Sequence, residues 1–202
     1  MQDTPQKKTQ TPLERFVDHT ASYGLDIQCA MDGRTDAEIV IISEYPGEQE
    51  VAFNKPFVGG AGKHLWGVLQ QQKIHRGMCY VTNVVKRRVG AKNQPAASEM
   101  QLWQESLLYE LEALTNVKLI ICLGNLAMET LLNQSGIIQY RGSVYKYKDT
   151  PVLCAYNPAY VLRMPQNEII FQMDMARAGE VYRGDYSEHT IHSTYNVPFR
   201  RS

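Results

Sequence analysis

The chain has 202 residues, with 21 basic and 21 acidic side chains and a formal net charge of zero at pH 7. An apolar content of 44% with 21% charged residues is typical of a globular protein and excludes a disordered chain. No apolar run approaches the ~20 residues that span a bilayer, and the first residues lack the apolar core of a signal peptide, so we expect a cytoplasmic protein that does not associate with membranes.

The predicted elements begin with an N-terminal arm at 1–36, which is polar apart from one amphipathic stretch at 13–23 that predicts a short helix. Apolar runs rich in β-branched residues then predict buried strands at 38–43, 79–82, 119–123 and 152–156. Helices are expected between them, and Ser98 with Gln101 forms a capping-box pattern that favours a helix start at Ser98. Residues 180–202 are polar and aromatic, which predicts a tail docked weakly or not at all.

Strands that are apolar on both faces and alternate with helices are typical of a parallel sheet covered on both sides. We therefore expect a three-layer α/β/α domain over residues 37–179, with a central, mainly parallel four-stranded sheet. Ligands of such sheets bind at the carboxyl ends of the strands. The loops that follow three of the strands are polar, at 44–47, 83–86 and 157–160, and predict a binding site, whereas the loop at 124–125 looks structural.

Positive charge is concentrated in one part of the chain. Between Glu50 and Glu99 there is no acidic residue, whereas Lys and Arg occupy eight positions in that stretch. Segregated charge in a neutral chain favours one positive face that suits a polyanion. The alternative, a set of solvated basic loops, stays open on charge alone.

The glycine-rich segment 55–63 is close to a phosphate-binding loop but does not match it. The first glycine of GxxxxGK[ST] would fall on Phe57, and Lys63 is followed by His64 rather than Ser or Thr. What remains is a glycine-rich turn that opens a helix, whose backbone N–H groups can hold a phosphate. The structural alternative is a tight turn that needs positive φ.

Three polar side chains follow the first two predicted strands. Glu44 and Glu50 come after the first strand, where a carboxylate can hold or activate a water molecule. Asn83 ends the second strand, and its amide carries both a donor and an acceptor that suit the edge of a nucleobase. The alternative is that Asn83 only terminates the strand and satisfies its own backbone.

Five short motifs follow in a fixed order: E-x-P-G-x-x-E at 44–50, P-F-V-G-x-A-G at 56–62, T-N-V-V-K at 82–86, L-G-x-x-A at 123–127 and N-P-A-Y-V-L-R at 157–163. This order resembles the uracil-DNA glycosylase superfamily, and most of all its family 4 (thermophile-type) enzymes, over roughly residues 38–177. The resemblance implies an enzyme that flips uracil, or a related pyrimidine, out of DNA, hydrolyses its N-glycosidic bond and leaves an abasic site.

The resemblance also implies roles for individual residues. Glu44 and Glu50 would place the attacking water, and Asn157 would support the negative charge of the departing base as a third catalytic residue. Base-binding positions would be Tyr45, Gly47, Phe57 and Asn83, with Phe57 stacking on the base and Asn83 reading its edge. DNA contacts are implied for Gly60, Gly62, Lys63, Lys86, Arg87, Arg88, Pro158, Tyr160, Leu162 and Arg163.

The chain departs from the family's pattern at several positions. Ser43 replaces a glycine, Tyr45 replaces a small residue, and Asn157 replaces a histidine. The cysteines of the family 4 iron–sulfur cluster are missing as well, because their expected positions hold Arg87 and Trp103 and the N-terminal arm offers only Cys29. Without thiolates there is no cluster, so we expect no cofactor and no metal, with hydrophobic packing around Trp103 instead.

Two functional interpretations stay open. The first is a monomeric glycosylase that acts on single- or double-stranded uracil-containing DNA without a metal. The second is a catalytically weak uracil- or DNA-binding module of a replication or repair assembly, with a protein partner. Glu44, Phe57 and Asn83 favour the enzyme, whereas Tyr45 and Asn157 favour the binding module.

Overall fold

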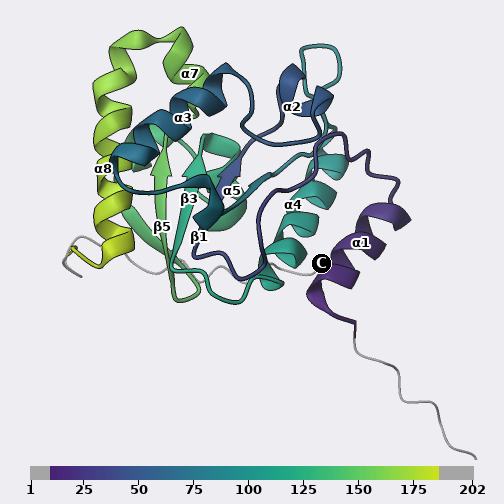
Figure 1. The fold of residues 1–202 in the computed structure, drawn as a ribbon. Helices are drawn as coiled ribbons and strands as arrows, with labels where there is room; N and C mark the ends of the chain where they lie inside the picture. Colours follow the sequence, from purple (N-terminus) through teal and green to yellow (C-terminus); the bar gives the residue numbers. More distant parts are fainter. Residues whose placement is uncertain (1–9, 187–202) are drawn as a thin grey trace, which may run out of the picture.

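Five strands form the central sheet, in the order β2-β1-β3-β5-β4 (Figure 1). The computed structural model describes residues 10–186. The strands β1 (Ile39–Ser43), β2 (Cys79–Asn83), β3 (Leu119–Leu123) and β5 (Thr150–Ala155) are parallel to one another, and β4 (Val144–Tyr147) pairs antiparallel with β5. The expected α/β class and mainly parallel sheet are confirmed.

The expected number of four strands is wrong, because the sheet has a fifth strand, β4. This strand forms one edge of the sheet, and only its first two residues, Val144 and Tyr145, are buried. An edge strand that is only partly buried lacks the continuous apolar run that marks the central parallel strands. Its sequence, Val-Tyr-Lys-Tyr, therefore carries a weaker signal than the fully buried strands β1, β2 and β3.

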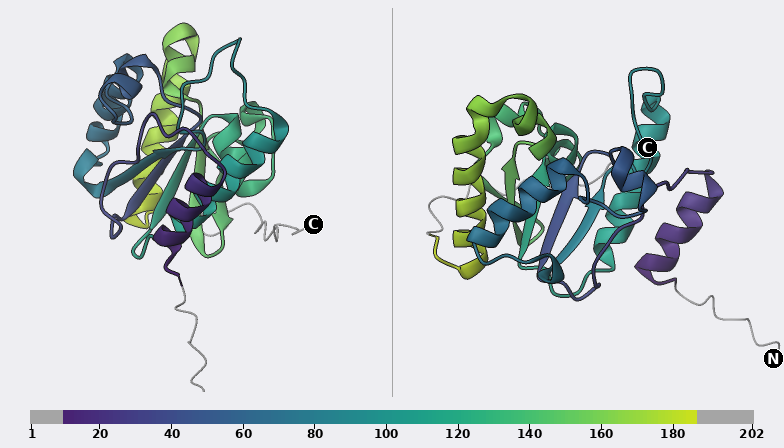
Figure 2. Two further views of the ribbon diagram at one scale, coloured as in Figure 1. Left: turned by 90° about the vertical axis from the view of Figure 1, so that its right-hand side faces the viewer. Right: turned by 45° about the horizontal axis from the view of Figure 1, so that its top comes forward.

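Helices cover both faces of the sheet (Figures 1 and 2). The helices α3 (Gly60–Gln71), α7 (Pro158–Arg163) and α8 (Glu168–Arg183) pack on the face that carries Ile39 and Ile41. The opposite face, with Val40 and Ile42, is covered by α4 (Ala97–Glu112) and α5 (Asn125–Leu132). Shorter elements connect these layers: α2 (Glu48–Ala52), α6 (Ile137–Tyr140) and the 3₁₀ turns η1 (Arg76–Met78) and η2 (Pro165–Asn167). No helix of residues 10–186 is long and apolar enough to cross a bilayer.

The helix expected at 13–23 is confirmed as α1 (Pro12–Ser22), which lies beside α4 (Figure 1). Thr11 caps it: the Thr11 hydroxyl accepts a hydrogen bond from the Glu14 N–H, and the Glu14 carboxylate accepts one from the Thr11 N–H. The capping box expected at Ser98 is wrong, because α4 begins at Ala97 and Ala96 occupies the cap position without a side-chain hydrogen bond.

The C-terminal helix α8 extends further than expected. It continues to Arg183, so residues 180–183 belong to the helix rather than to a tail. Val181 is buried, and the Tyr182 hydroxyl donates a hydrogen bond to the Glu38 carboxylate. The rest of the expected tail, from residue 187 on, lies outside the described residues.

A buried ion pair joins the loop after β2 to helix α4. The Lys86 and Glu110 side chains are 1% and 0% exposed, and Lys86 Nζ lies 2.6 Å from Glu110 Oε2. Lys86 Nζ also donates to Thr82 Oγ1 at 2.7 Å and to the Asn83 carbonyl at 3.0 Å. The buried ammonium group is thus held by one ion pair and two hydrogen bonds, and it does not reach the surface. The expectation that Lys86 contacts DNA is therefore wrong.

We expect Glu110→Gln to lower the free energy of unfolding by about 3–5 kcal/mol, because it leaves the buried Lys86 charge without a counterion. Urea denaturation followed by circular dichroism measures this change. The matched control is Glu112→Gln on the same helix, which removes the partly exposed Arg15–Glu112 pair and should cost less than about 1 kcal/mol. Equal effects of the two substitutions would contradict the importance of the buried pair.

Candidate active site

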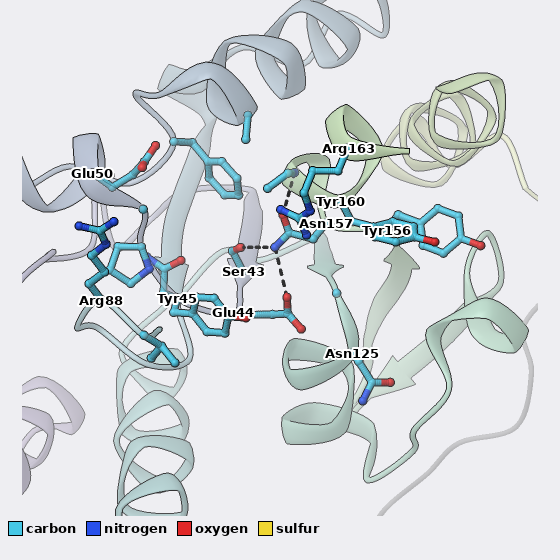
Figure 3. A pocket seen from close by; sticks show the side chains of 18 of the residues that line it. Ser43, Glu44, Tyr45, Glu50, Arg88, Asn125, Tyr156, Asn157, Tyr160 and Arg163 are labelled. Atoms are coloured by element: carbon cyan, nitrogen blue, oxygen red, sulfur yellow. Dashed lines mark hydrogen bonds between the residues drawn. The ribbon is translucent and has the colours of Figure 1, made fainter. Parts of the chain in front are cut away.

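A cavity of about 560 Å³ opens at the carboxyl ends of the parallel strands (Figure 3). The ligand cavities of proteins span roughly 300–1,000 Å³, so its size suits a nucleobase with its sugar. Residues from the predicted site that line the cavity are Glu44, Tyr45, Gly47, Glu50, Phe57, Asn83, Arg88, Asn157, Tyr160 and Arg163. Those that do not line it are Gly60, Gly62, Lys63, Lys86, Arg87, Pro158 and Leu162.

Glu44 lines the cavity and comes directly after β1. Its Oε1 accepts a hydrogen bond from the Leu126 N–H at 3.2 Å, at the start of α5, and its Oε2 accepts one from Asn157 Nδ2 at 3.4 Å. Burial raises the pKa of the Glu44 carboxyl above its ordinary value of 4.5, although these donors partly oppose the shift. The carboxylate is thus a stronger base than an exposed one.

Gly124 makes room for the Glu44 carboxylate. A Cβ atom at Gly124 would lie 2.6 Å from the Glu44 carboxyl carbon, and Gly124 also has a φ of +102°, which disfavours other residues. The expectation that the loop 124–125 is only structural is wrong, because Gly124 and Asn125 both line the cavity. The L-G-x-x-A motif and its place at the end of a strand indicate that Gly124 belongs to the site. No motif indicates Ile137 and Ile138, which also line the cavity.

The Asn157 side chain connects three parts of the site (Figure 3). Its Oδ1 accepts from the Ala159 N–H at 2.9 Å and so caps α7, whose first residue is Pro158. Its Nδ2 donates to Ser43 Oγ at 3.1 Å, besides the longer bond to Glu44. The amide is therefore held in place at the cavity wall, and the bond to Glu44 is the weaker of the two that it donates.

Asn83 lines the cavity and carries a buried donor. Its side chain is 3% exposed, and Nδ2 has no hydrogen-bond partner among residues 10–186. A buried polar group without a partner costs about 1–3 kcal/mol, so a ligand that supplies an acceptor gains from pairing with it. The alternative in which Asn83 satisfies its own backbone does not account for this free N–H group.

Glu50 holds the loop that carries Phe57. Glu50 Oε1 accepts hydrogen bonds from the Val58 N–H at 3.1 Å and the Gly59 N–H at 2.8 Å. A Cβ at Gly47 or Gly59 would lie within 3 Å of the Glu50 carboxylate, so both glycines leave space for it. Glu50 therefore anchors backbone amides, and its implied role in placing water stays a prediction.

Arg87 and Trp103 share one acceptor. Arg87 donates to both Glu99 oxygens at 2.7 and 2.9 Å, and Trp103 Nε1 donates to Glu99 Oε1 at 3.1 Å. The Arg87 guanidinium lowers the pKa of the Glu99 carboxyl, so this pair is charged at neutral pH. Arg87 is consequently already paired, which leaves it poorly suited to the DNA contact implied above.

The same residues do not fit an iron–sulfur cluster. Arg87 and Trp103 offer no thiolate, and their polar groups are directed at Glu99. Burial raises the pKa of the Cys29 thiol to about 11, which disfavours the thiolate that a metal requires. Within residues 10–186, no three His, Cys, Asp or Glu side chains are grouped as a metal site.

The exposed cations near the cavity come from three different elements. Arg88, in the loop after β2, is 56% exposed at the rim and lies 3.3 Å from Glu48. Arg163, at the end of α7, and Lys63, on α3, are exposed and have no ion-pair partner among the described residues. Leu162 is exposed beside Arg163, whereas Tyr160 packs against Tyr156 with ring centroids 5.3 Å apart.

We expect Glu44→Gln to raise the free energy of unfolding at pH 7. Because the folded-state pKa of Glu44 is raised, the stability contributed by this carboxyl is full below about pH 4.5 and is lost as the pH rises through the folded-state pKa. The neutral amide avoids that loss, so its advantage should vanish near pH 4. Urea denaturation at pH 7 and at pH 4 measures the free energy of unfolding of both proteins. The control is Glu48→Gln, at an exposed carboxylate, which should leave the free energy of unfolding unchanged at both pH values.

A gain from Glu44→Gln that is equal at the two pH values would contradict this assignment. It would mean that the substitution stabilises the protein by packing or by hydrogen bonds rather than by removing a buried charge.

Comparisons with known proteins agree with this geometry. The family model described as the uracil DNA glycosylase superfamily matches residues 30–178. The chain is 34% identical to a type-4 uracil-DNA glycosylase of Archaeoglobus fulgidus (74% of this chain, 79% of the relative) and 32% identical to one of Thermotoga maritima (68% and 73%). It is also 25% identical to a DNA polymerase of Bacillus phage SP01, over 79% of this chain but 17% of the polymerase. The chain belongs to the uracil DNA glycosylase superfamily.

Proposed function

We propose that the protein hydrolyses the N-glycosidic bond of uracil in DNA after the base has been flipped into the cavity. The observation that carries the proposal is the buried amide N–H of Asn83 on the cavity wall, for which residues 10–186 supply no acceptor. Family membership supports the same reaction, because two of the relatives named above are uracil-DNA glycosylases. The product would be an abasic site in the DNA and free uracil.

Recognition of the base follows from two residues on the cavity wall. The edge of uracil presents the O4 acceptor and the N3–H donor, and the Asn83 amide offers the complementary pair. Phe57 lines the same cavity and supplies an aromatic surface for stacking, which is worth about 1–3 kcal/mol per base. Cytosine presents the opposite pattern at these two positions, so the Asn83 amide in this orientation disfavours it.

Cleavage of the bond leaves negative charge on the base and positive charge on the sugar. The ionised Glu44 carboxylate stabilises the positive sugar and accepts a proton from the water whose oxygen bonds to C1′. The base leaves with the electron pair of the broken bond. Asn157 can shift its longer N–H bond from Glu44 to the base oxygen, where the negative charge develops.

A second function is favoured by one comparison. The chain corresponds to 17% of a phage DNA polymerase, so a domain similar to this one is continuous with a replication enzyme in that relative. This supports the alternative of a uracil- or DNA-binding module in a replication assembly. A protein that binds uracil-containing DNA tightly and releases no uracil would favour this alternative over the enzyme.

Asn83→Asp should shift the preference of the enzyme from uracil to cytosine. A carboxylate only accepts hydrogen bonds, so it pairs with the cytosine amino group and repels uracil O4. Oligonucleotides with a single uracil or cytosine are incubated with the protein, and alkali then cleaves the abasic sites. If Asn83→Asp retains full preference for uracil, Asn83 does not read the base; if the parent releases nothing, the proposed reaction is wrong.

Arg88→Gln should reduce the salt dependence of DNA binding. Each lost phosphate contact lowers the slope of log K against log salt by about one unit. Arg87→Gln is the matched control, because the guanidinium of Arg87 is already bound to Glu99 and its loss should leave the slope unchanged. Fluorescence anisotropy at several salt concentrations measures the slopes, and an equal reduction in both variants would contradict the assignment.

A further inference from the structure

Phe57 has an unusual backbone conformation for an aromatic residue. Its φ is +52°, in the left-handed region that bulky side chains rarely adopt, and its side chain is 8% exposed on the cavity wall. Such strain persists only where the surrounding structure holds the residue in place. The contacts around Phe57 therefore show what fixes its ring in the cavity.

Two side chains from other elements hold the carbonyl groups at Phe57. Trp66 Nε1, on α3, and Arg76 Nη1, in η1, donate to the Phe57 carbonyl at 3.1 and 3.2 Å. Arg76 Nη2 also donates to the Pro56 carbonyl at 2.7 Å. Two consecutive carbonyl groups are thus bound by groups that lie outside the loop.

The Arg76 guanidinium is itself held on two further sides. Its Nε and Nη2 donate to Asp32 Oδ2 at 2.9 and 2.7 Å, and its central carbon lies 5.0 Å from the centroid of the Trp66 ring. A guanidinium that contacts a carboxylate, an aromatic face and two carbonyl groups at once has little freedom to move. Asp32, Trp66 and Arg76 do not line the cavity, so they act on it through Phe57.

The other side of the loop is fixed independently. Glu50 binds the Val58 and Gly59 N–H groups, and a Cβ at Gly62 would lie 2.2 Å from the Phe57 carbonyl. The backbone of Phe57 is therefore enclosed between these contacts and the clamp formed by Trp66 and Arg76. Loss of the clamp would free the carbonyl groups and let Phe57 relax to negative φ, which turns its ring.

We propose that Trp66 and Arg76 are positioning residues that hold the Phe57 ring in the orientation needed to stack on the flipped base. The proposal rests on the proposed function, because it concerns the base that the cavity receives. Loss of the clamp should weaken the binding of DNA that places a base in the cavity. It should not weaken contacts between the protein and the DNA backbone. That distinction separates positioning from a general structural role.

Trp66→Phe removes the indole N–H and keeps an aromatic ring, and Arg76→Gln removes the paired donors. We expect both variants to lower the single-turnover rate on a uracil oligonucleotide, and the affinity for its uncleavable 2′-fluoro-deoxyuridine analogue, by about 10- to 100-fold. Affinity for the same oligonucleotide with a tetrahydrofuran abasic site should stay within about twofold of the parent. Lys55→Gln is the matched control, since Lys55 lies 3.5 Å from the same Asp32 carboxylate and should change none of these values.

The outcomes distinguish the clamp from the proposed reaction. Parent-like rates and affinities in both variants would overturn the clamp, as would an equal loss of affinity for the abasic oligonucleotide. A parent that releases no uracil contradicts the proposed reaction, and the clamp is then judged by binding alone. In that case it is supported if Trp66→Phe loses the preference for fluoro-deoxyuridine over the abasic site. It is overturned if that preference is unchanged or if the parent has none.

Discussion

The alignment of the parallel strands determines where the chemistry of this protein is located. The register pairs Ser43 with Asn83, and the last residues of β3 and β5 are paired in the same way. The chain therefore leaves all four strands at one edge of the sheet, and the next residues meet there whatever their distance in sequence. Glu44 and Asn157, 113 positions apart, are in hydrogen-bond contact for this reason.

Carboxylates in this site have a structural role besides the chemical one proposed above. Glu44 receives the Leu126 N–H group at the start of α5, and Glu50 receives two N–H groups of the Phe57 loop. Both carboxylates accept hydrogen bonds from backbone N–H groups that would otherwise lack a partner in the protein. An unpaired N–H group in a buried loop costs free energy of folding. The same bonds restrict the carboxylates to one orientation, which is the preorganisation that charge stabilisation in an active site requires.

The sequence predicted the parallel strands and ten of the 21 residues that line the cavity, because both depend on local patterns. Continuous apolar runs marked the central strands, and short motifs at their ends marked residues such as Glu44 and Asn83. The edge strand β4 was missed because half of it is only partly buried. The run Lys86-Arg87-Arg88 reads as one basic patch, yet Lys86 and Arg87 are paired with Glu110 and Glu99 on α4. Those pairings depend on tertiary packing, which a run of like charges does not reveal.

The exposed arginines at the cavity mouth belong to a chain whose net charge is zero. The cavity is lined by the carboxylates Glu44, Glu48 and Glu50 as well as by Arg88 and Arg163. A neutral chain whose arginines have carboxylates beside them has no overall attraction to DNA at long range, so association gains little from electrostatic steering. The arginines then act on phosphates only within the Debye length, about 8 Å at physiological ionic strength.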